Sequence, residues 1–105
     1  MTVDEYRKRY LEIQDIKKKL EEERLKDSPV QPGDIIQEKE YDVYSRQFEL
    51  MPYKYKVKKL SVNSSGDIFI TDVWAKKRDG SFGKQSMSIK FKVNTDKPNF
   101  VKIDE

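Results

Sequence analysis

The residues with the clearest chemical potential are lysines that alternate with aromatic and aliphatic side chains between positions 53 and 93. The densest runs are YKYKVKK at 53–59 and IKFK at 89–92. Ten lysine and arginine residues in this segment face only three aspartates, a net charge of +7 in a chain whose total is +3. Ammonium groups attract phosphates and aromatic rings stack on bases, so the pattern is typical of a nucleic-acid-binding surface.

We therefore expect one face of a sheet to contact nucleic acid or a nucleoprotein complex. The candidate binding residues are Tyr53, Lys54, Tyr55, Lys56, Lys58, Lys59, Phe69, Lys90 and Lys92. A second interpretation is an ordinary half-exposed strand surface, because lysine is strongly hydrated and also serves solubility.

The side chains that most enzymes and metal sites require are missing. The chain has no cysteine and no histidine, which excludes disulfides, thiolate ligands and the common catalytic triads. The sequence from Gly80 to Lys84 is similar to a phosphate loop, but its glycines are too close together and Gln85 follows the lysine. We expect a non-enzymatic binding protein without a cofactor or a metal ion.

Residues 1–28 predict a long helix, and residues 29–105 a small β domain. Thr2 and Glu5 have the spacing of a capping box, and neither glycine nor proline follows until Pro29. Apolar residues recur every three or four positions, at Val3, Tyr6, Tyr10, Ile13, Ile16 and Leu20. This stripe packs on the sheet in one interpretation, where it could cover the basic face. In the other it is a partner or homodimer arm through Tyr6, Tyr10, Ile13 and Leu20.

The spacing of the stripe is also that of a short coiled-coil seam. In the register that begins at Val3, however, Lys17 and Arg24 occupy seam positions.

The connector after the helix contains a turn and the beginning of a strand. Proline and glycine at 32 and 33 have the conformations that a turn requires, and Ile35 and Ile36 begin a strand. The string VQPGDII at 30–36 resembles the start of the first strand in small SH3-like barrels, which implies a fold and no function.

Residues 38–50 allow two interpretations. Tyr41 and Val43 alternate with polar neighbours as in a strand, whereas Tyr44, Phe48 and Met51 could line a helical turn. At the other end of the chain, residues 99–103 predict a short final strand.

Two turns set the expected registers of the central meander. Asp79-Gly80 predicts a two-residue type I′ hairpin, which places Ile70 opposite Ile89. The loop at 63–67 pairs Val62 with Ile68, Leu60 with Ile70, and Lys58 with Asp72. The expected core face is then Leu60, Val62, Ile68, Ile70, Met87, Ile89, Phe91 and Val93.

The opposite face depends on one irregularity. In a regular register it carries Tyr53, Tyr55, Val57, Lys59, Phe69, Thr71, Val73, Ser86, Ser88, Lys90 and Lys92. A bulge near Lys58-Lys59 would instead turn Tyr53, Tyr55 and Val57 inward and Lys54, Lys56 and Lys58 outward.

These elements predict an α+β protein with a long N-terminal helix and a small antiparallel sheet or SH3-like barrel of about five strands. No run of about 18 apolar residues exists, and the charged N-terminus is unlike a secretory signal. We expect a soluble cytoplasmic protein.

In its length, high charge, lack of Cys and His, and single helix on a small β domain, the chain resembles small proteins of phages and mobile elements. Anti-CRISPR proteins belong to that class. The resemblance implies an accessory inhibitor that contacts a host nuclease complex, as an alternative to direct nucleic-acid binding. A third alternative is a structural assembly subunit whose edge strands pair with neighbours.

Overall fold

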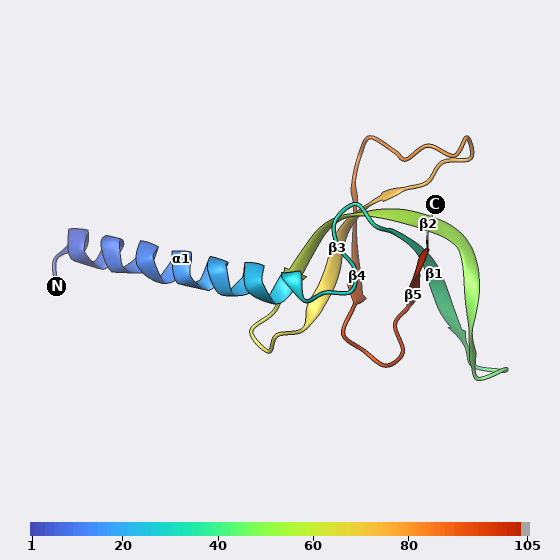
Figure 1. Cartoon of the computed structure of the whole chain (residues 1–105), viewed down its shortest axis with the longest axis horizontal. Coiled ribbons are helices and arrows are strands. Elements are labelled where there is room, and N and C mark those ends of the chain that lie inside the picture. Colours follow the sequence, from blue (N-terminus) through green and yellow to red (C-terminus); the bar gives the residue numbers. More distant parts are fainter. Residues whose placement is uncertain (104–105) are drawn as a thin grey trace.

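A computed structural model describes residues 1–103 as one long helix followed by an open, five-stranded antiparallel sheet (Figure 1). The elements are α1 Val3–Lys26, β1 Ile35–Asp42, β2 Gln47–Val62, β3 Ile68–Ala75, β4 Met87–Lys92 and β5 Phe100–Ile103. The strand order is β4-β3-β2-β1-β5. The expected α+β class is confirmed, and of the two expected β architectures the open sheet is the one that forms.

Local signals define both ends of α1. The Thr2 hydroxyl accepts a hydrogen bond from the Glu5 amide at 3.1 Å, as the capping box predicts. At the other end, the Gln31 side-chain amide donates to the carbonyls of Leu25 and Ser28, each at 2.9 Å. The Leu25 carbonyl also accepts from the Ser28 amide at 3.1 Å, so Gln31 adds a side-chain donor to the end of the helix.

Helix α1 extends away from the sheet, with the N-terminus at its far end (Figure 1). None of its residues is buried, and the molecule measures 60 × 33 × 20 Å. The interpretation in which the stripe packs on the sheet is therefore wrong. The connector explains this, because Gly33 donates to the Val57 carbonyl and Val57 to the Asp34 carbonyl, both at 2.8 Å. These bonds fix the chain against β2 soon after the helix ends, and Arg24 bonds the base of α1 to the Gly66 carbonyl, so that α1 projects from this point.

The core lies on one face of the curved sheet, which we call the inner face. Its buried residues are Val30, Ile36, Val57, Leu60, Ile68, Ile70, Val73, Val93 and Phe100. The rings of Phe91 on β4 and Phe100 on β5 stack with centroids 6.0 Å apart. The two edge strands thus approach each other over the core without joining the sheet into a closed barrel.

A bulge in β2 reverses the alternation of its side chains. Val57 and Leu60 are both buried although they are three residues apart, so one extra residue must lie between them. The bulged alternative for Lys58-Lys59 is therefore correct. The regular register, which placed Val57 on the second face, is wrong.

A matching irregularity occurs in β3, where Ile70 and Val73 are both fully buried. It restores the pairing, so that Leu60 stands opposite Ile70 and Val62 opposite Ile68, as expected. Within the bulge Asp72 pairs with Lys59, and the expected pairing of Lys58 with Asp72 is wrong. Placing Val73 on the second face was wrong for the same reason.

The hairpin between β3 and β4 differs from the type I′ prediction. Gly80 has a φ of +89°, whereas Arg46 is the one non-glycine residue of the described chain with positive φ. The Gly80 amide donates to the Lys77 carbonyl at 3.0 Å, and the Lys77 amide to the Ser81 carbonyl at 2.7 Å. The loop thus has three residues instead of two, which alone would move β4 by one residue in the opposite direction. Two extra residues between Phe82 and Met87, and one between Ser88 and Phe91, produce the observed register.

The register of β4 changes accordingly. Ile70 pairs with Phe91 and not with Ile89. Four of the expected core residues are buried, and Val62, Ile89 and Phe91 pack against them partly exposed. Met87, the remaining one, lies at the start of β4 and is 43% exposed.

Residues 38–50 form strands and their turn. Strand β1 continues to Asp42, β2 begins at Gln47, and Tyr41 pairs with Phe48. The helical-turn interpretation is therefore wrong. The predicted final strand is confirmed as β5, which pairs with β1.

Candidate nucleic-acid interface

The face of the sheet opposite the core, which we call the outer face, combines lysines with aromatic rings. Phe69 and Trp74 alternate with the buried residues of β3 and therefore point away from the core. Lys56 pairs with Trp74, and Lys92 with Phe69, so these lysines share that face. The outer face comprises Lys54, Lys56, Lys58, Phe69, Trp74, Lys90 and Lys92, together with Phe82 from the β3–β4 loop.

Three ammonium groups of the outer face lie over three aromatic rings. The Nζ atom of Lys90 is 5.2 Å from the centroid of Phe69, that of Lys58 is 5.6 Å from Trp74, and that of Lys56 is 6.0 Å from Phe82. Each distance is within the range of a cation–π interaction. The rings therefore favour positions of these ammonium groups above the sheet, by about 0.5–1 kcal/mol for each exposed pair.

Polar contacts fix two of the lysines further. Lys58 Nζ donates to the Ser86 hydroxyl at 3.2 Å. Lys92 Nζ lies 3.7 Å from a carboxylate oxygen of Asp67. Lys59, which belongs to the bulge, is exposed and stands opposite Asp72. A carboxylate thus partly offsets the charge of Lys92.

The two tyrosines of the predicted set lie on the other side of the sheet. Tyr55 stands opposite buried Ile36, packs against the core and donates from its hydroxyl to Glu38 at 3.2 Å. Burial and the Glu38 carboxylate raise the pKa of the Tyr55 phenol. Tyr53 is 54% exposed and borders a shallow hollow with Met51 and Phe91. The structure therefore brings Lys54, Lys56, Lys58, Phe69, Lys90 and Lys92 together and separates Tyr53 and Tyr55 from them.

Two aromatic residues of the outer face were missed from the sequence. Trp74 faces outward only because of the irregularity in β3, which the regular register ignored. The apolar residue types of Ile70 and Val73 were the available signal, since two apolar residues three apart in a strand suggest a bulge. Phe82 lies in the β3–β4 loop, and its approach to Lys56 follows from the fold of that hairpin alone.

The stripe on α1 is exposed along its whole length. Its six side chains, Val3, Tyr6, Tyr10, Ile13, Ile16 and Leu20, are between 51% and 65% exposed. The rings of Tyr6 and Tyr10 stack on each other with centroids 6.3 Å apart. Apolar side chains that repeat along one face of a helix are normally covered, so this face is a second candidate site.

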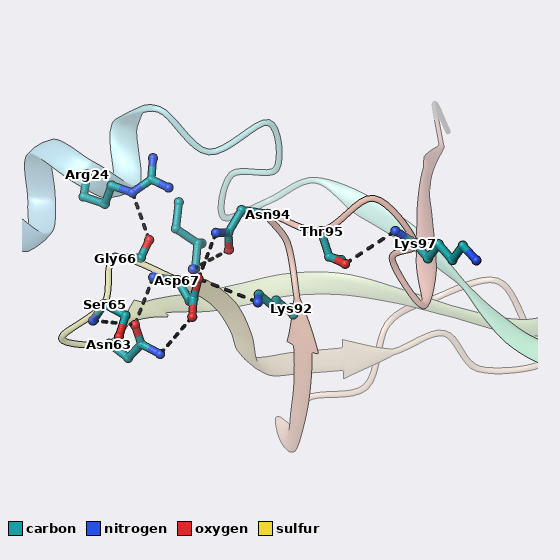
Figure 2. Close-up of polar contacts among 10 residues, drawn as sticks. Arg24, Asn63, Ser65, Gly66, Asp67, Lys92, Asn94, Thr95 and Lys97 are labelled. Atoms are coloured by element: carbon teal, nitrogen blue, oxygen red, sulfur yellow. Dashed lines mark hydrogen bonds and ion pairs between the residues drawn. The ribbon is translucent and has the colours of Figure 1, made fainter.

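A hydrogen-bonded junction holds the base of α1 beside the sheet (Figure 2). Arg24 Nε donates to the carbonyl of Gly66 in the β2–β3 loop at 3.0 Å. The next residue, Asp67, accepts from the side-chain amide of Asn94 at 3.1 Å, and the Asn94 carbonyl oxygen accepts from the Ile68 amide at 2.9 Å. The side-chain amides of Asn94 and Asn63, with Lys92 nearby, lower the pKa of Asp67. The helix, the β2–β3 loop and the end of β4 are thus tied together at one point.

Other kinds of site find no support in the described part of the chain. Within residues 1–103 no group of Asp and Glu side chains is placed to hold a metal ion. No helix in the same range is both long and apolar enough to cross a membrane. Comparison with protein-family models, curated proteins and solved structures gave no match to this chain.

Proposed function

We propose that the outer face binds the phosphate backbone of a nucleic acid, either free or within a nucleoprotein complex, and that the protein is not an enzyme. The observation that carries the proposal is the row of lysines held over Phe69, Trp74 and Phe82. Ammonium groups fixed in place lose less conformational entropy on meeting a phosphate than freely moving ones do. Neutralised phosphates release their counterions, which supplies most of the affinity in non-specific binding.

The position of the lysines determines the kind of contact we expect. Because an ammonium group lies over each ring, phosphates are contacted first and a base stacks only where a lysine moves aside. We therefore expect weak dependence on base sequence and strong dependence on salt. The separation of Tyr53 and Tyr55 from this face reduces the stacking surface that the sequence had suggested.

Trp74 provides a built-in probe, because it is the one tryptophan of the chain and lies beneath Lys58. We expect its fluorescence to change when single- or double-stranded DNA or RNA is added. The logarithm of the binding constant should fall linearly with the logarithm of the salt concentration. Replacing one contacting lysine should reduce the magnitude of that slope by about one.

The decisive variant is Lys56→Glu/Lys90→Glu, with Lys8→Glu/Lys18→Glu on the helix as a control of equal charge change. The first pair should weaken binding by on the order of tenfold or more, since two attractive phosphate contacts become repulsive. The control should retain most of the affinity. Equal loss in both variants would show that net charge alone, and not the outer face, governs binding.

A second candidate function rests on α1. Its exposed apolar stripe favours a helical arm that docks on another protein, which suits an accessory inhibitor of the phage or mobile-element type acting on a host nuclease complex. Such binding should persist in salt and be lost in Tyr10→Ala/Ile13→Ala, the reverse of the pattern expected for the outer face. If the protein is instead a structural subunit that assembles through the edge strands β4 and β5, its self-association should be unchanged in the lysine variants of the outer face and in Tyr10→Ala/Ile13→Ala.

A further inference from the structure

The charges beside the stripe on α1 are segregated along the helix. In the heptad that begins at Val3, the two positions flanking the seam hold Arg7 and Arg9 in the N-terminal half. In the C-terminal half the same positions hold Glu21 and Glu23. One end of the seam is therefore flanked by cations and the other by anions, on a helix that projects from the molecule.

We propose that α1 pairs antiparallel with α1 of a second copy of this chain. Reversing one helix places Arg7 beside the partner's Glu21, and Arg9 beside the partner's Glu23. The two-fold axis repeats both contacts at the other end, which gives four complementary pairs. An isologous pairing of this kind closes on itself and produces a dimer.

The same register also covers the apolar stripe. Tyr10 then packs against the partner's Leu20, and Ile13 against the aliphatic stem of the partner's Lys17. Ile16 lies near the two-fold axis, beside its own copy. The stripe, which is at least half exposed in the monomer, becomes the buried seam of the pair.

A parallel pair would not use these charges. In that arrangement a flanking residue meets the partner residue five positions further along the sequence. Arg9 would stand beside the partner's Gln14, and Ile16 beside the partner's Glu21. Lys17 and Arg24 would each face their own copy across the seam, which brings like charges together. The direction of pairing is thus chosen by the sequence of α1 itself.

Lys17 keeps the interaction modest. A lysine at a seam position specifies register and oligomeric state but reduces stability. Its ammonium group reaches solvent while its methylene groups cover Ile13 of the partner helix. A helix of 24 residues offers three heptads at most, so we expect a reversible dimer.

The antiparallel arrangement places the two β domains at opposite ends of a rod about 36 Å long, given the 1.5 Å rise per residue. Two outer faces on one particle would raise the avidity for a long polyanion without any new contact. The pairing itself does not depend on nucleic-acid binding and can be tested in its absence.

The test is a charge exchange followed by sedimentation at a series of protein concentrations without nucleic acid. In Arg7→Glu/Arg9→Glu all four flanking charges are acidic, and in Glu21→Arg/Glu23→Arg all four are basic. Each variant alone should be monomeric where the wild-type chain is dimeric. An equimolar mixture of the two should dimerise again, which rules out simple unfolding of the helix as the cause.

A matched control and a direct distance complete the test. Lys8→Glu/Lys18→Glu changes charge by the same amount away from the seam and should remain dimeric. A spin label on Asp4→Cys, the one cysteine of that variant, should report an axial separation of about 33 Å in the antiparallel pair, against none in a parallel one. A monomeric wild-type chain, a mixture that stays monomeric, or a short distance between labels would overturn the proposal.

Discussion

The inner face of the sheet and the stripe on α1 are both periodic apolar surfaces, yet they end in opposite environments. Ile70 and Val57 have no exposed surface, whereas Ile13 and Leu20 are each 62% exposed. The sheet curves until its own edge strands and the connector cover its inner face. Helix α1 projects from the β domain, so no described part of the chain covers the stripe. Apolar periodicity therefore identifies a surface that needs a partner and does not say whether the same chain provides it.

The largest expected effect comes from making the same substitution in both regions. Ile70→Ala should reduce the free energy of unfolding by about 2–5 kcal/mol, because it leaves a cavity in the core. Ile13→Ala should change it by less than about 0.5 kcal/mol in dilute solution, where α1 is monomeric. Urea denaturation followed by circular dichroism measures both, and a similar loss in the two variants would break the comparison.

Amide hydrogen exchange should show the same contrast residue by residue. Helices in proteins gain most of their stability from tertiary packing, and no residue of α1 is buried, so amides between Val3 and Leu20 should exchange by local opening. Amides of Ile68 and Ile70 should exchange only on global unfolding. Protection of the helix that rises with protein concentration would support the dimer, and protection equal to that of β3 in dilute solution would contradict the contrast.

The junction between the two regions can be weakened separately. Arg24→Ala removes the hydrogen bond to the Gly66 carbonyl and should cost about 1 kcal/mol, as expected for one partly buried bond. Lys26→Ala, in the same turn but exposed, is the control. Exchange rates should rise at the base of α1 in the first variant only, while β1 and β5 stay protected.

The smallest effect concerns pH at that junction. The pKa of Asp67 is lowered below its ordinary value of 3.8, mainly by Asn94 and then by Asn63. The Asp67 carboxylate therefore stabilises the fold fully at pH values above 3.8. That contribution is lost as the pH falls through the lowered pKa. An NMR titration of Asp67 should show the lowered pKa, and Asn94→Ala should move it back toward 3.8. An unchanged midpoint in the variant would show that Asn94 does not hold the carboxylate.

Much of the fold follows from contacts between residues close in sequence. The Thr2 cap, the end of α1 before Pro29, and the pairing of Val62 with Ile68 across a short loop each depend on a few neighbouring residues. The lysines of the outer face also follow from the sequence once the bulge at Lys58-Lys59 is accepted. These features can be predicted from the sequence because each turn or cap satisfies its own backbone hydrogen-bonding groups with neighbouring residues.

The remaining features depend on contacts between distant strands. The outward direction of Trp74 depends on two irregularities that must compensate each other across the β2–β3 pair. Nothing within either strand alone sets that compensation. The position of β4 depends on a further irregularity between β3 and β4. The three-residue β3–β4 loop likewise replaced a turn that Asp79-Gly80 alone would favour.

The sequence by itself determined an α+β chain without the residues for common catalysis, a capped 24-residue helix with an apolar stripe, and a basic meander. The tertiary structure decided which side chains share a face, and that α1 projects instead of covering the sheet. The physical reason is range: hydrogen bonds of caps and turns are made within a few residues. Burial of Val57, Val73 and Phe100 in one core requires strands from the whole domain to meet.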